Sequence, residues 1–111
     1  MRRTRGLVFL LFAPHVLEVD LHARYAMQTL ADGITLDMST YEGLFPGPVL
    51  TAAVGDQVIV HFVNETWQDT TVHWHGLRIS DQMDGSPRIQ TPVPEGGTFT
   101  YSFVVPDAGT F

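Results

Sequence analysis

The centre of the chain is the run Gln57-Val58-Ile59-Val60-His61-Phe62-Val63-Asn64, which follows the turn residues Gly55-Asp56. The run is apolar on almost both faces of an extended backbone and rich in β-branched residues. This pattern is typical of a strand in the middle of a sandwich, covered on both faces. The sequence therefore predicts a central β-strand over residues 57–64. His61 alternates with Ile59 and Val63, and we interpret it as a hydrogen-bonded or partly exposed histidine rather than a metal ligand.

Further strands are predicted on both sides of this run. An alternation of apolar and polar residues from Val16 predicts a half-buried strand, and His22 falls on its polar face. After the turn signal Ala31-Asp32-Gly33, residues 34–39 alternate again, with Ile34, Leu36 and Met38 on the expected buried side. Residues 98–105 alternate aromatic with small polar residues, which is a strong strand pattern.

Two shorter runs, residues 49–51 and 71–75, are also extended in character, so the expected total is six or seven strands. Turn signals recur every eight to twelve residues and no helical periodicity of useful length occurs. The sequence predicts an all-β sandwich or barrel. Between these strands, Asn64-Glu65-Thr66 fits the glycosylation sequon, and residues 80–97 form a long loop of the kind that often carries function.

Composition limits the number of domains and the partners. The chain has 111 residues, 44% of them hydrophobic, which is enough for one globular domain and too short for two ordinary ones. Six basic residues, all Arg, stand against 12 acidic ones, and three of the six lie within the first five residues. The remainder is so acidic that nucleic acid is excluded as a main partner. The absence of cysteine excludes disulfides, thiolate nucleophiles, Cys-based zinc or iron–sulfur sites and a blue-copper centre within this chain.

Residues 1–14 resemble a short secretory signal peptide or its remnant. A basic start is followed by the apolar run Gly6–Ala13, which is too short to span a bilayer, and no other segment could span one. Pro14 follows directly and no small-x-small cleavage site is evident, so an apolar first strand or a misplaced start remain alternatives. We assign residues 15–111 to one domain. A signal peptide would place the protein in the periplasm or outside the cell.

Chemistry is concentrated in Thr71-Val72-His73-Trp74-His75-Gly76. In a strand, side chains alternate between faces, so His73 and His75 are expected on one face and Trp74 on the other. Two neighbouring imidazoles form half of a copper or zinc site. A chance His-x-His on the polar face of a strand explains the pair equally well from these residues alone. His15 and His22 have no partner at ligand spacing, and we interpret both as surface residues.

An ordered series of motifs resembles the first cupredoxin-like domain of the multicopper oxidases, the laccase-like group. The likeness runs from about Gly33 to the end of the chain. Its motifs are Phe45-Pro46-Gly47-Pro48, Gly55-Asp56, Thr71-Val72-His73-Trp74-His75-Gly76-Leu77, Met83-Asp84-Gly85, Gln90-Thr91-Pro92-Val93-Pro94, Phe99-Thr100-Tyr101 and Asp107-Ala108-Gly109-Thr110-Phe111. The resemblance implies an all-β, Greek-key sandwich or barrel of cupredoxin type that is incomplete at its C-terminus.

The resemblance also implies roles for three residues. His73 is similar to the ligand of the type 2 copper, and His75 is similar to a ligand of one type 3 copper in a trinuclear cluster. Asp84 resembles the carboxylate that helps to deliver protons during dioxygen reduction, and such a carboxylate can also orient a ligand histidine. As an alternative, Asp84 is a turn-forming residue before Gly85.

In that family a second His-x-His pair follows the Ala-Gly-Thr-Phe stretch, whereas this sequence stops at Phe111. We therefore expect an N-terminal piece of a longer oxidase, whose missing cupredoxin domains belong to the same chain or oligomer. The whole enzyme is expected to oxidise a phenol, metal ion or similar reductant and to reduce dioxygen to water. The 111-residue chain alone is expected to be inactive. A non-catalytic β-sandwich that binds a metal or a protein is the alternative, while a small electron-transfer cupredoxin is excluded by the absent cysteine.

Overall fold

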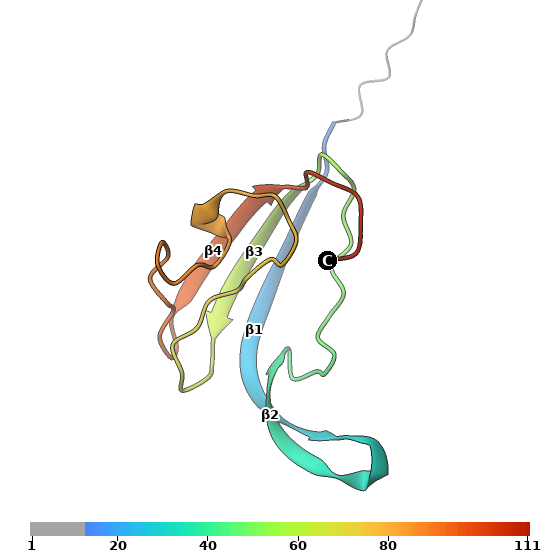
Figure 1. The fold of residues 1–111 in the computed structure, drawn as a ribbon, viewed down its shortest axis with the longest axis vertical. Coiled ribbons are helices and arrows are strands. Elements are labelled where there is room, and N and C mark those ends of the chain that lie inside the picture. Colours follow the sequence, from blue (N-terminus) through green and yellow to red (C-terminus); the bar gives the residue numbers. More distant parts are fainter. Residues whose placement is uncertain (1–12) are drawn as a thin grey trace, which may run out of the picture.

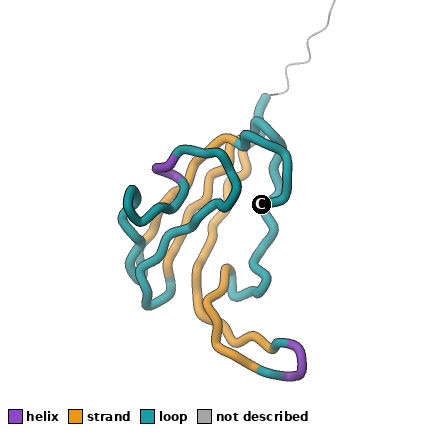
Figure 2. The backbone as a smooth tube through the Cα atoms, in the orientation of Figure 1, coloured by secondary structure: helices purple, strands orange, loops and turns teal. Residues whose placement is uncertain are grey.

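A four-stranded β-sheet organises the part of the chain that the computed structural model describes, residues 13–111 (Figure 1). The strand order is β2-β1-β3-β4, and β1 pairs with β3 in parallel while the other pairs are antiparallel. The strands are β1 (Val16–Thr29), β2 (Thr35–Tyr41), β3 (Gln57–Asn64) and β4 (Thr98–Val104). These four predicted strands are confirmed, and the fold is all-β. Two 3-10 turns, η1 (Ala31–Gly33) and η2 (Asp81–Met83), interrupt the loops (Figure 2).

The core lies on one face of the sheet, where long loops cover it. Every second residue of β3 points inward, and Val58, Val60 and Phe62 are buried. They pack with residues from β1, β4 and the loops, namely Leu21, Ala23, Val72, Val93 and Tyr101. Removing this apolar surface from water is the main stabilising contribution to the fold.

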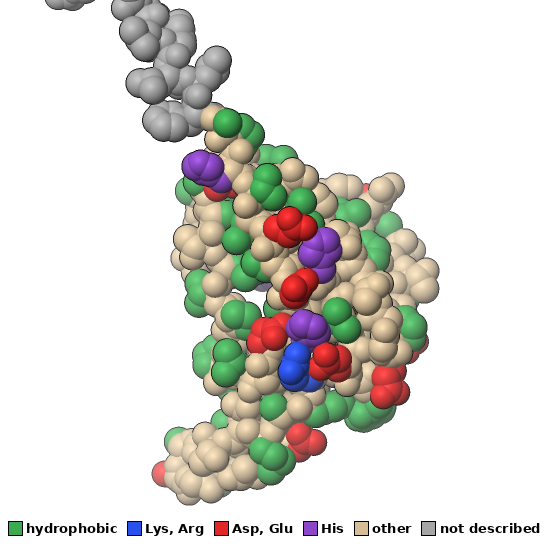
Figure 3. Space-filling model, turned by 180° about the vertical axis from the view of Figure 1, so that it is seen from behind, with side chains coloured by type: hydrophobic (Ala, Val, Ile, Leu, Met, Phe, Trp, Pro, Cys, Tyr) green, Lys and Arg blue, Asp and Glu red, His purple; other side chains and the backbone are tan. Residues whose placement is uncertain are grey.

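The opposite face of the sheet is not covered by any described segment, so the prediction that β3 is covered on both faces is wrong for residues 13–111. Ile59, His61 and Val63 are half-buried there. Their neighbours on β1 and β4 are polar, as expected for a face in contact with water. Charged and histidine side chains gather on this face (Figure 3).

The second half of β1 and the whole of β2 form a hairpin that projects from the body of the domain (Figure 1). Met38, which was predicted to be buried, is half-buried, so this prediction is confirmed in part. Ile34 and Leu36, in contrast, are 56% and 47% exposed. Their predicted burial is wrong, because the contacts made on the hairpin by other described segments, such as Trp67 on Tyr25 and Gly43 on Gln28, leave both side chains uncovered.

The predicted strands over residues 49–51 and 71–75 do not form. Val49 is 89% exposed and its segment pairs with no described strand. Near residues 71–75 the only ladder contact within the described chain is an isolated bridge between Thr70 and Val93. Beyond Thr70 the backbone contacts side chains and another loop instead of a neighbouring strand, which keeps it extended without making it part of a sheet.

Asn64 uses its side chain to shape the loop that leads to this segment. It is fully buried, and its Nδ2 donates to the carbonyl oxygens of Gln68 and Val93, each at 2.8 Å. Its Oδ1 accepts from the Thr66 backbone N–H at 2.9 Å and from the Thr66 hydroxyl at 2.6 Å. The folded domain therefore uses the sequon asparagine as an internal hydrogen-bonding group and leaves it inaccessible to a glycan.

Replacement of Asn64 by Ala is expected to lower the free energy of unfolding by about 3 kcal/mol, because several buried polar groups lose their partners together. Urea denaturation followed by circular dichroism measures this change. The matched control is Asp69→Ala, an exposed position in the same loop, with an expected effect within about 0.5 kcal/mol. Equal denaturation midpoints for the two variants would contradict the assigned role.

Candidate metal centre

Trp74 determines the direction in which the two histidines point. Its ring packs edge-on against Tyr101, with ring centroids 5.7 Å apart, and against Phe103, with centroids 5.0 Å apart. With Trp74 turned into the core, the residues on either side of it turn outward. The His73 and His75 rings lie on the same side, with centroids 5.5 Å apart and planes at 71°. The predicted shared side is confirmed, although the segment is not a strand.

His73 has one ring nitrogen occupied and the other free. Its Nδ1 lies 2.9 Å from the backbone carbonyl oxygen of Asp84, which can only accept a hydrogen bond. In the neutral imidazole, Nδ1 therefore carries the proton and Nε2 carries the lone pair. A carbonyl partner of this kind is the usual second contact of a metal-binding histidine, since it sets the tautomer and the ring orientation.

The carboxylate of Asp84 faces the same imidazole. Its Oδ1 lies 3.2 Å from His73 Nδ1, but the ring N–H is used by the carbonyl, and the buried Oδ1 has no hydrogen-bond partner among residues 13–111. A buried carboxylate oxygen without a partner is costly unless a cation or a hydrogen-bond donor compensates it. The two outward imidazoles are donors that suit copper or zinc, whereas the Asp84 carboxylate lies beside His73 Nδ1, away from the ring nitrogen left for a metal. The two histidines therefore fit a metal centre.

Gly85 explains how Asp84 reaches His73. Its φ is +71°, a left-handed conformation, and a Cβ there would lie 2.1 Å from the carbonyl oxygen of Val72. Only glycine permits this approach between the two segments. The Thr71 hydroxyl completes the contact by donating to the Gly85 carbonyl oxygen at 2.6 Å. The turn in Met83-Asp84-Gly85 was predictable from its Asp-Gly pair, but the segment it packs against was not.

A second contact joins the segment after His75 to the last residues of the chain. Arg78 donates to both carboxylate oxygens of Asp107, from Nε at 2.9 Å and from Nη2 at 2.6 Å. These hydrogen bonds hold the pKa of Asp107 below its ordinary value and raise the pKa of Arg78. The ring of Phe111 lies against Gly76, where a Cβ would be 3.1 Å from it. The Arg78–Asp107 pair was not predicted from the sequence, because 29 residues separate the two side chains and neither belongs to a recognisable pattern.

The other histidines have different partners. His22 Nδ1 lies 2.9 Å from Glu42 Oε1, and His61 Nε2 lies 2.7 Å from Glu18 Oε1. For Glu42, burial would raise the pKa, but hydrogen bonds from the His22 backbone and ring outweigh it, and the pKa lies below its ordinary value. The interpretation of His61 as a hydrogen-bonded histidine is confirmed. His22 is on the outer face of the sheet, as predicted, although it is half-buried.

Within residues 13–111, no three His, Cys, Asp or Glu side chains are arranged to hold a metal ion together. A complete metal centre at His73 and His75 would need donor atoms from outside residues 13–111.

Comparison with known proteins identifies the fold and the family. Residues 22–111 match the family model described as "Multicopper oxidase". The chain belongs to the multicopper oxidase family. The family consists of copper-dependent oxidoreductases, which agrees with the resemblance read from the motifs and with a cupredoxin-like fold.

Curated multicopper oxidases and solved structures support this membership. The chain is 43% identical over 72 residues to Multicopper oxidase MmcO of Mycobacterium tuberculosis, covering 65% of this chain and 14% of that protein. It is 44% identical over 84 residues to Laccase-1 of Cryptococcus neoformans, covering 72% of this chain and 14% of that protein. A multi-copper oxidase of Pseudomonas thermotolerans superposes with a TM-score of 0.82 at 36% identity, over 87% of this chain and 24% of the other. The chain thus spans about 14% of the length of these two curated multicopper oxidases.

Replacement of Gly85 by Ala is expected to destabilise the domain more than the same change at Gly96. Both glycines have a left-handed φ, +71° and +73°, so both substitutions carry backbone strain of about 1–2 kcal/mol. Only Gly85 adds a steric clash, because the Cβ position at Gly96 has nothing within 4 Å. We expect an additional loss of about 1–3 kcal/mol for Gly85→Ala in urea denaturation. Equal losses for the two variants would show that the close approach to Val72 contributes nothing.

Proposed function

We propose that His73 and His75 are copper ligands in the first cupredoxin domain of a multicopper oxidase. By correspondence with the family motif, His73 takes the type 2 position and His75 one of the type 3 positions of a trinuclear cluster. The convergence of the two imidazoles, with the His73 Nδ1 held by the Asp84 carbonyl oxygen, is the observation that carries this assignment. It leaves the Nε2 of His73 as its coordinating atom.

Asp84 is proposed to hold and transfer protons beside these ligands. Its buried, unpaired Oδ1 can accept a proton or a hydrogen bond from a bound water without first losing another partner. The bound copper ions would supply stepwise electron transfer to dioxygen, a reaction that consumes protons. We propose that Asp84 delivers these protons, while its carbonyl oxygen accepts the hydrogen bond that sets the tautomer of His73.

For the whole protein we propose the oxidation of a small reductant, such as a phenol or a metal ion, coupled to the reduction of dioxygen to water. The relatives' much greater length supports the proposal that further cupredoxin domains supply the remaining ligands and the electron-entry site. We further propose that residues 1–14 are a signal segment, residues 15–111 belong to the first domain, and the protein is secreted or periplasmic. Residues 1–12 lie outside the described structure. In residues 13–111 no helix is long and apolar enough to cross a membrane.

Removal of either ligand is expected to weaken copper binding. In calorimetric titration with Cu(II), the wild-type chain is expected to bind one ion weakly, since two imidazoles leave the other positions to water. His73→Ala and His75→Ala are each expected to raise the Kd by about tenfold or more, in line with the loss of a direct ligand.

His61→Ala is the matched control, because His61 is hydrogen-bonded to Glu18 and Thr100 on the outer face of the sheet. It is expected to bind Cu(II) like the wild-type chain. Equal binding by all four proteins would contradict the proposed ligands. The same samples, mixed with a phenol in air, are expected to show no oxidation, because the chain carries only part of the ligand set.

A further inference from the structure

Tyr101 joins the core of the domain to the backbone that carries the histidines. It lies in β4, is fully buried, and packs against Phe62, Trp74 and Phe99. Its hydroxyl oxygen accepts a hydrogen bond from the backbone N–H of Val72 at 2.8 Å. Val72 directly precedes His73 and has no strand partner. The hydroxyl therefore replaces the hydrogen bond that a neighbouring strand would otherwise make to this peptide.

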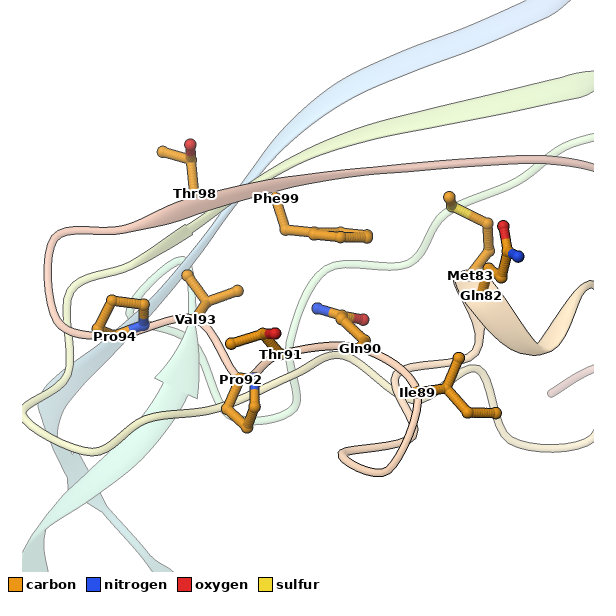
Figure 4. A pocket seen from close by; sticks show the side chains of 10 residues that line it. All are labelled: Gln82, Met83, Ile89, Gln90, Thr91, Pro92, Val93, Pro94, Thr98 and Phe99. Carbon is orange, nitrogen blue, oxygen red and sulfur yellow. The ribbon is translucent and has the colours of Figure 1, made fainter.

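Gln90 fixes the hydroxyl from the other side. Its side-chain amide lies 3.1 Å from the Tyr101 oxygen, and Gln90 is 5% exposed. Gln90 Nε2 donates to the Tyr101 hydroxyl oxygen, so this oxygen accepts hydrogen bonds from both Gln90 and the Val72 N–H. Figure 4 shows the Gln90 side chain beside Phe99 in the wall of an open hollow of about 630 Å³. Gln90 thus comes from the long loop and lies against the Tyr101 hydroxyl of β4.

The backbone of Val72, the residue before His73, is held from two directions. The Tyr101 hydroxyl binds the N–H of Val72, and the backbone of Gly85 lies against the Val72 carbonyl group. His73 itself is then oriented by the Asp84 carbonyl oxygen. Of these contacts, only the one to Tyr101 connects the His-x-His segment directly to the sheet by a hydrogen bond. Loss of the hydroxyl would leave the buried Val72 N–H unpaired and release the segment from β4.

We propose that Tyr101, held by Gln90, is a positioning residue for the His73–His75 metal centre. It acts through the Val72 backbone and does not touch the metal. This role rests on the proposed copper-binding function. It means that the Tyr101 hydroxyl group, in the core, contributes to the affinity for copper. Supporting contacts beyond the ligands commonly change metal affinity by about 10–100-fold.

The test compares Tyr101→Phe with Tyr25→Phe in the 111-residue chain. Tyr101→Phe keeps the aromatic packing and removes only the hydroxyl. We expect its Kd for Cu(II) to rise by about tenfold, its Cu(II) electron paramagnetic resonance spectrum to differ from the wild type, and the Val72 amide to exchange with solvent at least about tenfold faster in the metal-free chain. Tyr25, which stacks on Trp67, is the control, and its variant is expected to match the wild type in all three measurements.

Each outcome separates this proposal from the proposed function. Unchanged copper affinity, spectrum and Val72 exchange in a folded Tyr101→Phe protein would overturn the positioning role while leaving the copper function intact. Absence of copper binding by the wild type would instead remove the proposed function and the positioning role with it. If Tyr101→Phe does not fold, Gln90→Met takes its place, because it frees the hydroxyl of its second partner without filling the site. A copper affinity of Gln90→Met that is lower than that of the wild type supports the positioning role, even where the loss is less than about tenfold. An affinity equal to that of the wild type contradicts it.

Discussion

The packing of Trp74 against Tyr101 and Phe103 is the contact on which the arrangement of His73 and His75 depends. Aromatic pairs of this geometry stabilise a structure by about 1 kcal/mol each beyond the area they bury. Within the described part of the chain the indole Nε1 has no hydrogen-bond partner, so the contacts that hold the ring there are packing contacts. Because Trp74 packs against the core, the imidazoles of the two residues that flank it point away from the core. A segment without strand partners is thereby given the side-chain alternation of a strand.

Backbone contacts of the Asp84–Gly85 segment further orient the His73 ring. Gly85 lets the Asp84 segment approach the Val72 carbonyl group, and this approach brings the Asp84 carbonyl oxygen to the His73 Nδ1. The Arg78–Asp107 ion pair joins the chain after His75 to the final turn. The centre is therefore built from three loop segments that meet on one face of a sheet. Loops placed by a rigid scaffold are a common way to carry chemistry.

Much of the fold could be predicted because each strand carries its own period-two pattern. The strands beginning at Val16 and Gln57 follow directly from alternation, and so does β4. Alternation failed where partners decide the outcome: residues 71–75 alternate like a strand, but no neighbouring backbone pairs with them. It failed again at Leu36, whose apolar side chain is exposed because the hairpin projects from the body.

The arrangement of the candidate site was predictable to a similar degree. The spacing of His73 and His75 predicted that their rings share one side, and they do. The contacts that support them were not predictable, because Gln90 and Tyr101 lie 17 or more residues from His73 in sequence and have ordinary local patterns. Asn64 is a related case. Its sequence context fits a glycosylation site, but its side chain is buried and makes four hydrogen bonds. Long-range proximity of this kind comes from topology and leaves no mark in a short window of sequence.

Pulsed electron paramagnetic resonance of the Cu(II)-loaded chain decides whether His73 and His75 hold the copper, because it detects the imidazole nitrogens coupled to the metal. We expect couplings from two imidazoles in the wild type, one in His73→Ala and one in His75→Ala, and two in His61→Ala. Two couplings that persist in the double variant His73→Ala/His75→Ala would contradict these ligands.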